Sequence, residues 1–587
     1  TADGGVPADR GGGGAGGRIA FATTGNTFTG VLRARGATGL ADACPARHGT
    51  FNFPTNAPDM DLVVSNDIAF PPGTNWCFRS LTVTNGARVE IQSHVGTAAA
   101  LYTNEIASRI RVVNDVTITA GATVAADGLG YPENQGEGRG GRGSYGDGGG
   151  GGYGGRGGLP NTSRGGDTYG RADQPDRLGS GGGNPQSDQQ GGFGGGAVLL
   201  DAGGRITVEG NITAHGGWGN YRSGGGSGGS IWLKAAEITG GGLIAADGGK
   251  GIADAAIVRG SGGGGGRIAL DTPSNLFGGI IRAKGHPSGV HPGHHGTYMF
   301  RPDADKDLVI EHDIALPPGT NWVFRSLTVT NGSTFEIQSV PGTADLNYTN
   351  ELASRLLLIE DLFVASNATL SANSLGYRHT SGPGAGTVGN NGGAGASHGG
   401  LGGTGAAGTV RPVYGDPLAP GLLGSGGAGD GSTPQYGGSG GGALILAAGG
   451  RAVVEGSLTA HGGDANPGTA PSTTSRAGGG SGGSVWLVAP AIAGRGAIGA
   501  DGGKGTPTST TTGGGGGAGG RILLAYGRVA DLERRAKDAI VTDTRPSNLD
   551  FDGLVTVAGA SGFTPGEAGT VRYLYLPPPT GTLFMVR

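Results

Sequence analysis

The cysteines Cys44 and Cys77 are the residues of this sequence best suited to covalent chemistry. The segment around Cys77 recurs later in the chain with Val323 in place of the thiol, and the loop around Cys44 aligns with His291 in its second copy. Because both thiols are missing from the second copy together, we predict a disulfide between them. It would close a loop of about 30 residues, contribute about 3 to 4 kcal/mol and indicate an oxidising compartment. Two unrelated buried thiols are the alternative.

Histidine is concentrated in one segment, HPSGVHPGHHG. Four of the 11 histidines lie there: His286, His291, His294 and His295. Neutral imidazole is a good ligand of zinc and nickel. However, the segment that contains this loop occurs three times in the chain. The loop of its first occurrence keeps only His48, and the loop of its last occurrence keeps no histidine. We therefore expect a solvated loop, with a histidine-bound metal as the less favoured alternative.

Carboxylates that recur in both copies could act as general acids or bases. Glycoside hydrolysis uses two carboxylates that flank one bond. The recurring candidates are Asp67 with Asp313, Glu90 with Glu336, Glu105 with Glu351, and Glu209 with Glu455. None stands in a cluster that differs from exposed strand residues, and the motif H-E-x-x-H is missing from the sequence. We therefore predict that the protein is not an enzyme.

Further carboxylates occur close together at Asp59 and Asp61 and in the segment 303–307. Carboxylate oxygens are the ligands that calcium prefers. These segments lack the glycine and the distal glutamate of an EF-hand loop. We therefore expect no cofactor, with a structural calcium ion as the less favoured alternative.

The composition excludes several classes of protein. The 587 residues include 135 glycines, about three times the usual share, and only three methionines, so a single core of bulky side chains is not expected. The formal charge of −4 shows no basic excess, so we predict no nucleic-acid partner. No run of 18 apolar residues exists, so we predict no transmembrane segment. A chain that begins at Thr1 suits either a mature exported product or a fragment.

Internal repetition indicates how the chain is organised. The segment PPGTNWCFRSLTVTNG, which begins at Pro71, returns 246 residues later as PPGTNWVFRSLTVTNG, and a shorter module that contains ADGG occurs three times. We therefore divide the chain into alternating modules A and B, followed by a tail. The boundaries are 1–60 (A), 61–245 (B), 246–306 (A), 307–499 (B), 500–576 (A) and 577–587 (tail).

Short segments of alternating apolar residues recur within the modules. Examples are SLTVT from Ser80, VTIT from Val116 and RITVEGNITA from Arg205. Period-two alternation of β-branched residues, closed by glycine or asparagine, is the signal of a strand. Strands this short and frequent leave no room for crossover helices. We predict an all-β fold, a β-solenoid of short stacked rungs similar to a parallel β-helix. A string of β-sandwich domains is the alternative.

Each B module contains a glycine-rich tract, at about 132–196 and 378–442. Glycine-rich segments usually behave as flexible linkers. These two tracts, however, have nearly equal lengths and contain matching Tyr-Gly pairs at Tyr169 and Tyr414. We favour ordered strands of the polyproline-II type, in which neighbouring backbones approach too closely for a Cβ.

The segment 529–541, VADLERRAKDAIV, differs in character from the rest of the chain. It lacks glycine and proline and places Leu532, Ala536 and Ile540 four residues apart. It also contains an i,i+4 pair of opposite charge. The pattern predicts a short amphipathic helix inserted in the last A module, which would cap the solenoid, make a contact or form a plain surface insertion.

The segments GGGSGGSIWL, LIAADGGKG and SGGGGGRIAL follow one another in the chain from Gly224. This pattern, together with SHGGLGG from Ser397, resembles that of large, mostly uncharacterised glycine-rich tandem-repeat proteins that are secreted or surface-exposed. The resemblance covers most of modules A and B. It implies an extracellular, non-catalytic structural role and identifies no functional residues.

The chain ends in three prolines and the segment GTLFMVR. Four residues of this segment form an apolar strand candidate: Leu583, Phe584, Met585 and Val586. Such a strand could pair with the open end of another copy, and a contact of this kind repeats into a fibre. Alternatively, the tail folds back on its own last module. We predict an extracellular structural protein that assembles with copies of itself into a filament. The alternative is a cell-surface protein that binds or degrades extracellular polysaccharide.

Overall fold

The computed structural model describes most of the chain. The described residues are 15–20, 49–52, 55–143, 147–159, 163–185, 189–252, 260–287, 291–319, 321–431, 436–465, 476–506, 511–527 and 539–577. Within them the fold is essentially all-β, as the sequence predicts. The helical elements found there are two 3-10 turns, Ala98–Ala100 and Ala344–Leu346. The chain divides into two units, residues 1–301 and 302–587, called here the first and the second unit.

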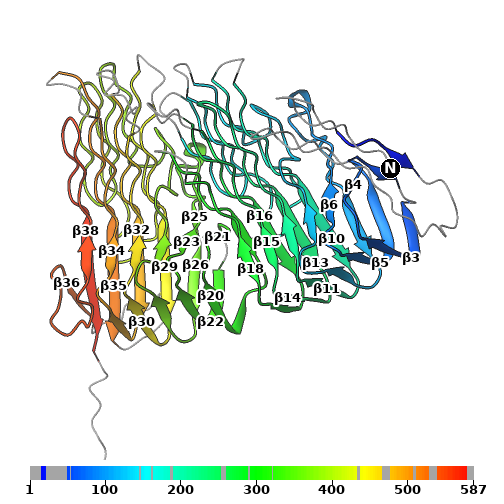
Figure 1. The fold of residues 1–587 in the computed structure, drawn as a ribbon. Helices are drawn as coiled ribbons and strands as arrows, with labels where there is room; N and C mark the ends of the chain where they lie inside the picture. The colour runs from blue at the N-terminus through cyan, green and yellow to red at the C-terminus, as the bar shows by residue number, and fades with distance from the viewer. Residues whose placement is uncertain are drawn as a thin grey trace, which may run out of the picture. The chain divides into compact units, whose positions relative to one another are not determined.

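The first unit is built from parallel strands that pair in long ladders (Figure 1). One set contains β3 (Asn56–Val64), β5 (Asn75–Val83), β7 (Arg109–Val112), β8 (Val116–Ile118), β10 (Ala197–Ala202), β11 (Arg205–Val208), β13 (Ser230–Lys234), β14 (Glu237–Gly240), β16 (Arg267–Asp271), β17 (Ser274–Phe277) and β19 (Thr297–Met299). A second set contains β4 (Ile68–Phe70), β6 (Arg88–Ile91), β9 (Thr123–Ala125), β12 (Asn211–Thr213), β15 (Leu243–Ala245) and β18 (Ile280–Arg282). The short strands β1 (Ile19–Ala20) and β2 (Phe51–Asn52) pair with each other.

The second unit repeats this arrangement. One set contains β20 (Asp303–Ile310), β22 (Asn321–Val329), β26 (Arg355–Leu358), β27 (Leu362–Val364), β29 (Ala443–Ala448), β30 (Arg451–Val454), β32 (Ser484–Ala489), β33 (Ala491–Ala493), β35 (Arg521–Gly527) and β38 (Thr570–Leu576). The other contains β21 (Ile314–Leu316), β23 (Thr334–Ile337), β28 (Thr369–Ser371), β31 (Ser457–Thr459), β34 (Ala497–Gly499) and β37 (Leu554–Thr556). Antiparallel pairs join β24 (Ser339–Val340) to β25 (Leu352–Ala353), and β36 (Ile540–Thr542) to β38.

Each inner strand pairs in parallel with an earlier and a later strand of the chain. A group of consecutive strands that pairs in this way with the group before it and the group after it is called a rung here. Ile231 of β13, for example, pairs with Val198 of β10 and with Ile268 of β16. All three side chains are fully buried. Because the pairing is in register, apolar side chains of one face stack into columns, and burying each contributes about 1.5 to 3 kcal/mol. The core of each unit therefore contains columns of aliphatic side chains, together with buried aromatic rings such as Trp76 and Trp322.

The glycine-rich segments extend beyond the strands as extended chains that run side by side (Figure 1). They bond backbone to backbone: Gly183 N–H donates to the Gly149 carbonyl at 2.8 Å, and Gly515 N–H donates to the Gly393 carbonyl at 3.0 Å. A Cβ on Gly224 would lie 1.9 Å from the Gly149 carbonyl oxygen. Glycine is needed there because another backbone occupies the space of a side chain.

One sequence-based prediction is wrong in part. Residues 529–538 of the predicted helix lie outside the described residues, but Ile540 and Val541 at its end belong to strand β36. β36 pairs with Tyr573–Tyr575 of β38. Pairing with an exposed strand edge supplies backbone hydrogen bonds that outweigh the local helical pattern.

Candidate functional site

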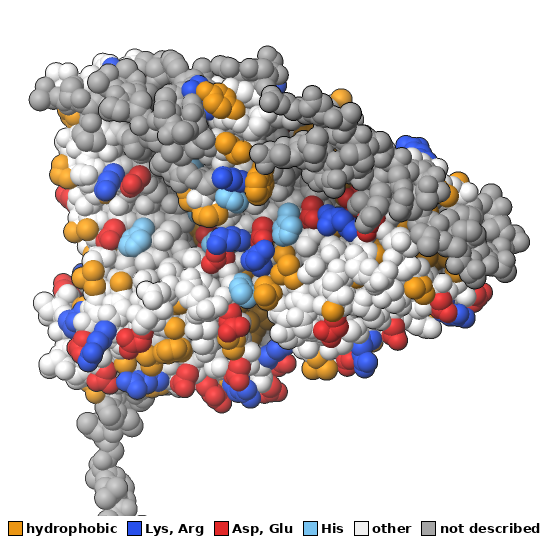
Figure 2. Space-filling model, viewed as in Figure 1, with side chains coloured by type: hydrophobic (Ala, Val, Ile, Leu, Met, Phe, Trp, Pro, Cys, Tyr) orange, Lys and Arg blue, Asp and Glu red, His pale blue; other side chains and the backbone are white. Residues whose placement is uncertain are grey.

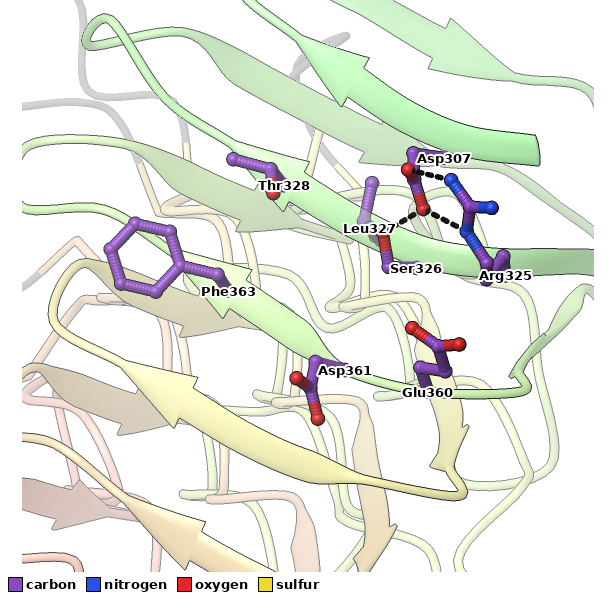
Figure 3. Close-up of a pocket in the computed structure, with 8 residues that line it drawn as sticks. All are labelled: Asp307, Arg325, Ser326, Leu327, Thr328, Glu360, Asp361 and Phe363. Atoms are coloured by element: carbon purple, nitrogen blue, oxygen red, sulfur yellow. Dashed lines mark hydrogen bonds and ion pairs between the residues drawn. The ribbon is translucent and has the colours of Figure 1, made fainter.

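A polar groove on the second unit contains several side chains of adjoining rungs (Figure 3). Its volume is about 510 Å³, and its lining residues are Asp307, Arg325, Ser326, Leu327, Thr328, Glu360, Asp361 and Phe363. Pairing of β20 with β22 sets Asp307 beside Ser326. Asp307 Oδ1 accepts hydrogen bonds from Arg325 Nε at 2.8 Å and from Ser326 Oγ at 2.6 Å. Arg325 Nη2 donates to the other carboxylate oxygen.

These contacts keep Asp307 ionised. The hydrogen bond from Arg325, followed by that from Ser326, lowers the pKa of Asp307 to about 2. The first unit contains the same cluster, in which Arg79 and then Ser80 lower the pKa of Asp61 to about 2. Asp61 and Asp307 were candidate calcium ligands by sequence, but each is held by an arginine. Within the described residues, no group of three or more histidine, cysteine or acidic side chains could hold a metal ion.

The opposite side of the groove is formed by the turn between β26 and β27. Asp361 Oδ1 accepts a hydrogen bond from the backbone N–H of Arg451 at 2.6 Å, which fixes its carboxylate. Phe363 lies at one end of the groove and Arg325 at the other (Figure 3). The Phe363 side chain is 39% exposed. The groove thus combines an accessible aromatic ring with fixed oxygen acceptors.

A second candidate site is buried and centres on one of the recurring glutamates. In the first unit, Glu105 accepts hydrogen bonds from Tyr131 Oη at 2.5 Å and from the backbone N–H of Leu178 at 3.1 Å. Arg177 Nε lies 2.8 Å from the same carboxylate. The Tyr102 ring stacks edge-on against Tyr131, with centroids 5.1 Å apart. The repeated segments YTNE and LGY therefore meet around one carboxyl group.

The second unit contains the same site without the arginine. Glu351 accepts hydrogen bonds from Tyr377 Oη at 2.6 Å and from the backbone N–H of Leu423 at 2.8 Å. Leu422 occupies the chain position that corresponds to Arg177. Burial raises the pKa of Glu351 to about 7. Burial also raises the pKa of Glu105, although the Tyr131 hydrogen bond and the Arg177 charge oppose it.

A ladder of side-chain acceptors links successive rungs at the ends of the short strands. Asp127 Oδ1 accepts from the backbone N–H of His215 at 2.8 Å, and His215 Nδ1 accepts from that of Asp247 at 3.1 Å. Asp247 Oδ1 accepts in turn from the N–H of Lys284 at 2.8 Å. The same ladder in the second unit comprises Asn373, His461, Asp501 and Ala558. These histidines therefore satisfy backbone donors.

The other recurring carboxylates also make structural contacts. Asp67, Asp313 and Glu209 each accept a hydrogen bond from the backbone of a neighbouring rung, at 2.9, 2.8 and 3.2 Å. Glu90 lies 3.6 Å from an arginine nitrogen on its own strand. The remaining two are Glu336, which is buried, and Glu455, which is half-buried.

The histidine segment is only partly solvated. His291 is buried, and burial lowers its pKa to about 4. His295 Nδ1 accepts a hydrogen bond from the backbone of Gly285 at 3.1 Å. The expectation of a solvated loop is therefore wrong for His291, because the packed glycine-rich segments enclose it.

Two sets of predicted residues cannot be compared with the structure. Cys77 lies half-buried on β5, but Cys44 lies outside the described residues, so the disulfide stays a prediction. The tail residues Leu583, Phe584, Met585 and Val586 also lie outside them.

Sequence reasoning missed Phe363, Arg177 and Tyr131. Comparing the two copies could have found Phe363 and Arg177, because each differs from its counterpart. Tyr131 belongs to a repeated tripeptide, but nothing in the sequence showed that it contacts Glu105.

Comparison with known proteins assigns no family. No family model, curated protein or solved structure matches the chain. Within the described residues, no helix has the length and apolar character needed to cross a membrane. The view in Figure 2 shows acidic and basic side chains interspersed over the described surface.

Proposed function

We propose that the protein is an extracellular structural protein, a β-solenoid whose copies assemble head to tail into a filament. The observation that carries this proposal is the continuous parallel pairing of short strands. Neighbouring parallel strands lie about 4.8 Å apart. Their backbone donors and acceptors bond to each other along the direction in which the strands stack, so the stack forms a stiff body. Stacked repeats of this kind suit extended scaffolds.

The glycine-rich tracts support the same role. Their backbone hydrogen bonds and the close approach at Gly224 fit a layer of packed polyproline-II-like strands. In such a layer each chain bonds to its neighbours and no bulky side chain intervenes. We infer that the layer stiffens each unit along the direction in which the rungs stack.

Assembly requires an accessible strand edge at an end of the stack. β36 covers only Tyr573–Tyr575 of β38. Within the described residues β37 pairs with β34 alone, and its residue Leu554 is 63% exposed. An edge of this kind can accept a strand from another copy. We propose that the apolar tail, Leu583–Val586, supplies that strand.

Negative-stain microscopy of the purified full chain over a range of concentrations tests this proposal. Filaments are expected to appear as the concentration rises, whereas discrete particles at every concentration would refute assembly. Deleting residues 580–587 should abolish filaments, and normal filaments without them would refute tail addition alone.

An edge variant tests where the contact forms. Leu554→Lys places a charge at the exposed edge of β37 and should weaken assembly, because charged edges oppose strand addition. Leu101→Lys is the matched control, since Leu101 is 79% exposed in a turn of the first unit. Equal effects of the two variants would contradict a contact at β37.

A further inference from the structure

The polar groove of the second unit points to a ligand, and this inference does not depend on filament assembly. We propose that the groove binds a neutral saccharide. Phe363 would support the apolar face of a sugar ring, while Glu360 and the cluster of Asp307, Arg325 and Ser326 would bond its hydroxyl groups. Ligand sites commonly combine an apolar contact surface with a few fixed polar groups.

The aromatic ring is placed by strand pairing. Phe363 pairs with Thr328 of β22 and with Val453 of β30, which lie on either side of it in one cross-strand row. Smaller neighbours leave its ring accessible from the groove (Figure 3). An aromatic side chain gains most when its apolar face is covered, and a sugar ring presents C–H groups of matching size.

The polar groups are fixed before any ligand arrives. Arg325 and Ser326 hold Asp307 through three hydrogen bonds, yet a carboxylate can accept about four, and the guanidinium retains further N–H groups. Within the part of the chain that the structure describes, the Glu360 side chain forms no hydrogen bond or ion pair. Its carboxylate is therefore available to accept bonds from hydroxyl groups.

The charge of the groove decides which saccharides fit. Three carboxylates, of Asp307, Glu360 and Asp361, face a single arginine. A ligand that carries carboxylate or sulfate groups would meet like charge, whereas hydroxyl groups donate well to ionised oxygens. The groove therefore favours neutral over acidic saccharides.

The first unit provides an internal comparison. It keeps the cluster of Asp61, Arg79 and Ser80 with the same hydrogen bonds. However, Asn114 and Thr117 stand at the positions of Glu360 and Phe363. The shared cluster is thus a structural feature of both units, and the two changed residues distinguish the groove of the second unit.

Isothermal titration of the full chain with cellohexaose, chitohexaose and maltohexaose tests the proposal, with hexagalacturonate as the acidic probe. We expect saturable binding of at least one neutral probe at one site per chain. The Kd for hexagalacturonate should be at least tenfold higher. Failure of all three neutral probes to bind at millimolar concentration would overturn the proposal. Preferential binding of hexagalacturonate would also overturn it.

Exchanging residues between the units tests the assignment. Phe363→Thr should raise the Kd about tenfold, because the sugar loses its aromatic contact. Glu360→Asn should also raise the Kd. Both substitutions introduce residues that stand at the same positions of the first unit, so the fold should tolerate them. The reciprocal double variant Asn114→Glu and Thr117→Phe should raise the stoichiometry from one site per chain to two. An unchanged Kd in Phe363→Thr, or an unchanged stoichiometry in the reciprocal variant, would overturn the assignment.

Discussion

The two units carry opposite chemistry along the same row of their parallel strands. In the first unit the row beginning at Cys77 continues through Arg111, Asp201, Lys234 and Asp271, with charges of alternating sign. In the second unit it comprises Val323, Leu357, Ala447, Val488, Ala525 and Leu574, which are all apolar. Neighbours in such a row lie about 4.8 Å apart, so opposite charges or apolar contacts both stabilise it.

The comparison shows which features hold the rungs in register. The backbone pairing, the acceptor ladder and the packed glycines recur in both units, although the side chains of this row do not. Register therefore depends on contacts close to the backbone. The side chains of such rows are free to change chemistry, as Phe363 and its counterpart Thr117 also show.

The largest expected effect comes from glycine positions that the units share. Gly224→Ala and its counterpart Gly478→Ala would place a Cβ 1.9 and 2.1 Å from a carbonyl oxygen of a neighbouring backbone. We expect each to lower the free energy of unfolding by at least about 3 kcal/mol, because two backbones must separate. Chemical denaturation measures this.

Gly278→Ala is the control for those variants, since its Cβ would meet nothing within 4 Å. We expect it to change stability by less than about 0.5 kcal/mol. A loss in Gly224→Ala as small as that of the control would contradict the close packing.

The next effect distinguishes His398 from its counterpart Tyr153. Burial lowers the pKa of His398 to about 4, below the value of 6.5 for an exposed imidazole. The unfolded chain therefore binds the proton more readily, so stability is full above pH 6.5 and falls as the pH drops toward 4, by about 3 kcal/mol. His398→Tyr should remove this part of the acid sensitivity, as measured by melting temperature between pH 4 and pH 7.

Tyr153 shows that a tyrosine fits at the position equivalent to His398. The Tyr153 and Tyr169 rings lie 4.8 Å apart, and the His398 and Tyr414 rings lie 4.7 Å apart, so the second unit offers a similar ring environment. Unchanged acid sensitivity in His398→Tyr would show that other groups govern it.

A third effect concerns Glu351, for which stability falls as the pH rises, in contrast to His398. Its folded pKa of about 7 lies above the ordinary glutamate value of 4.5. The folded state therefore prefers the protonated carboxyl, and stability is full below pH 4.5 and falls as the pH rises to 7, by about 2 kcal/mol after allowance for partial burial. Leu422→Arg introduces the residue of the first unit and should reduce this loss, because the guanidinium favours the ionised form.

Melting curves from pH 4 to pH 8 test that expectation, with Glu351→Gln as a reference that cannot titrate. If Leu422→Arg leaves the alkaline loss unchanged, Arg177 does not account for the difference between the two glutamates.

The smallest effect concerns the contrasting rows. Lys234→Val in the first unit should cost about 1 kcal/mol or less, because an exposed charge between two aspartates contributes little. Val488→Lys in the second unit should cost about 2 kcal/mol, because Val488 is buried between Ala447 and Ala525 and its charge would lack a partner. Equal losses in urea denaturation would contradict the contrast.

Some features followed directly from the sequence. Period-two alternation in segments such as RITVEGNITA predicted strands that the structure contains as β11 and β12. The 246-residue repeat predicted two equivalent sets of elements, because nearly identical segments face the same steric and hydrogen-bonding requirements. The differences between copies were equally visible, including Val323 for Cys77 and Phe363 for Thr117.

Other features depended on tertiary structure. The meeting of Glu105 with Tyr131 and Leu178 joins segments 26 and 73 residues apart, and no local pattern encodes such a contact. The end of the predicted helix became strand β36 because an exposed edge was available to it. Sequence alone thus determined the strands and their repetition, which arise from local periodicity. Tertiary structure decided which carboxylates are buried and which line a groove, because stacking brings distant rungs side by side.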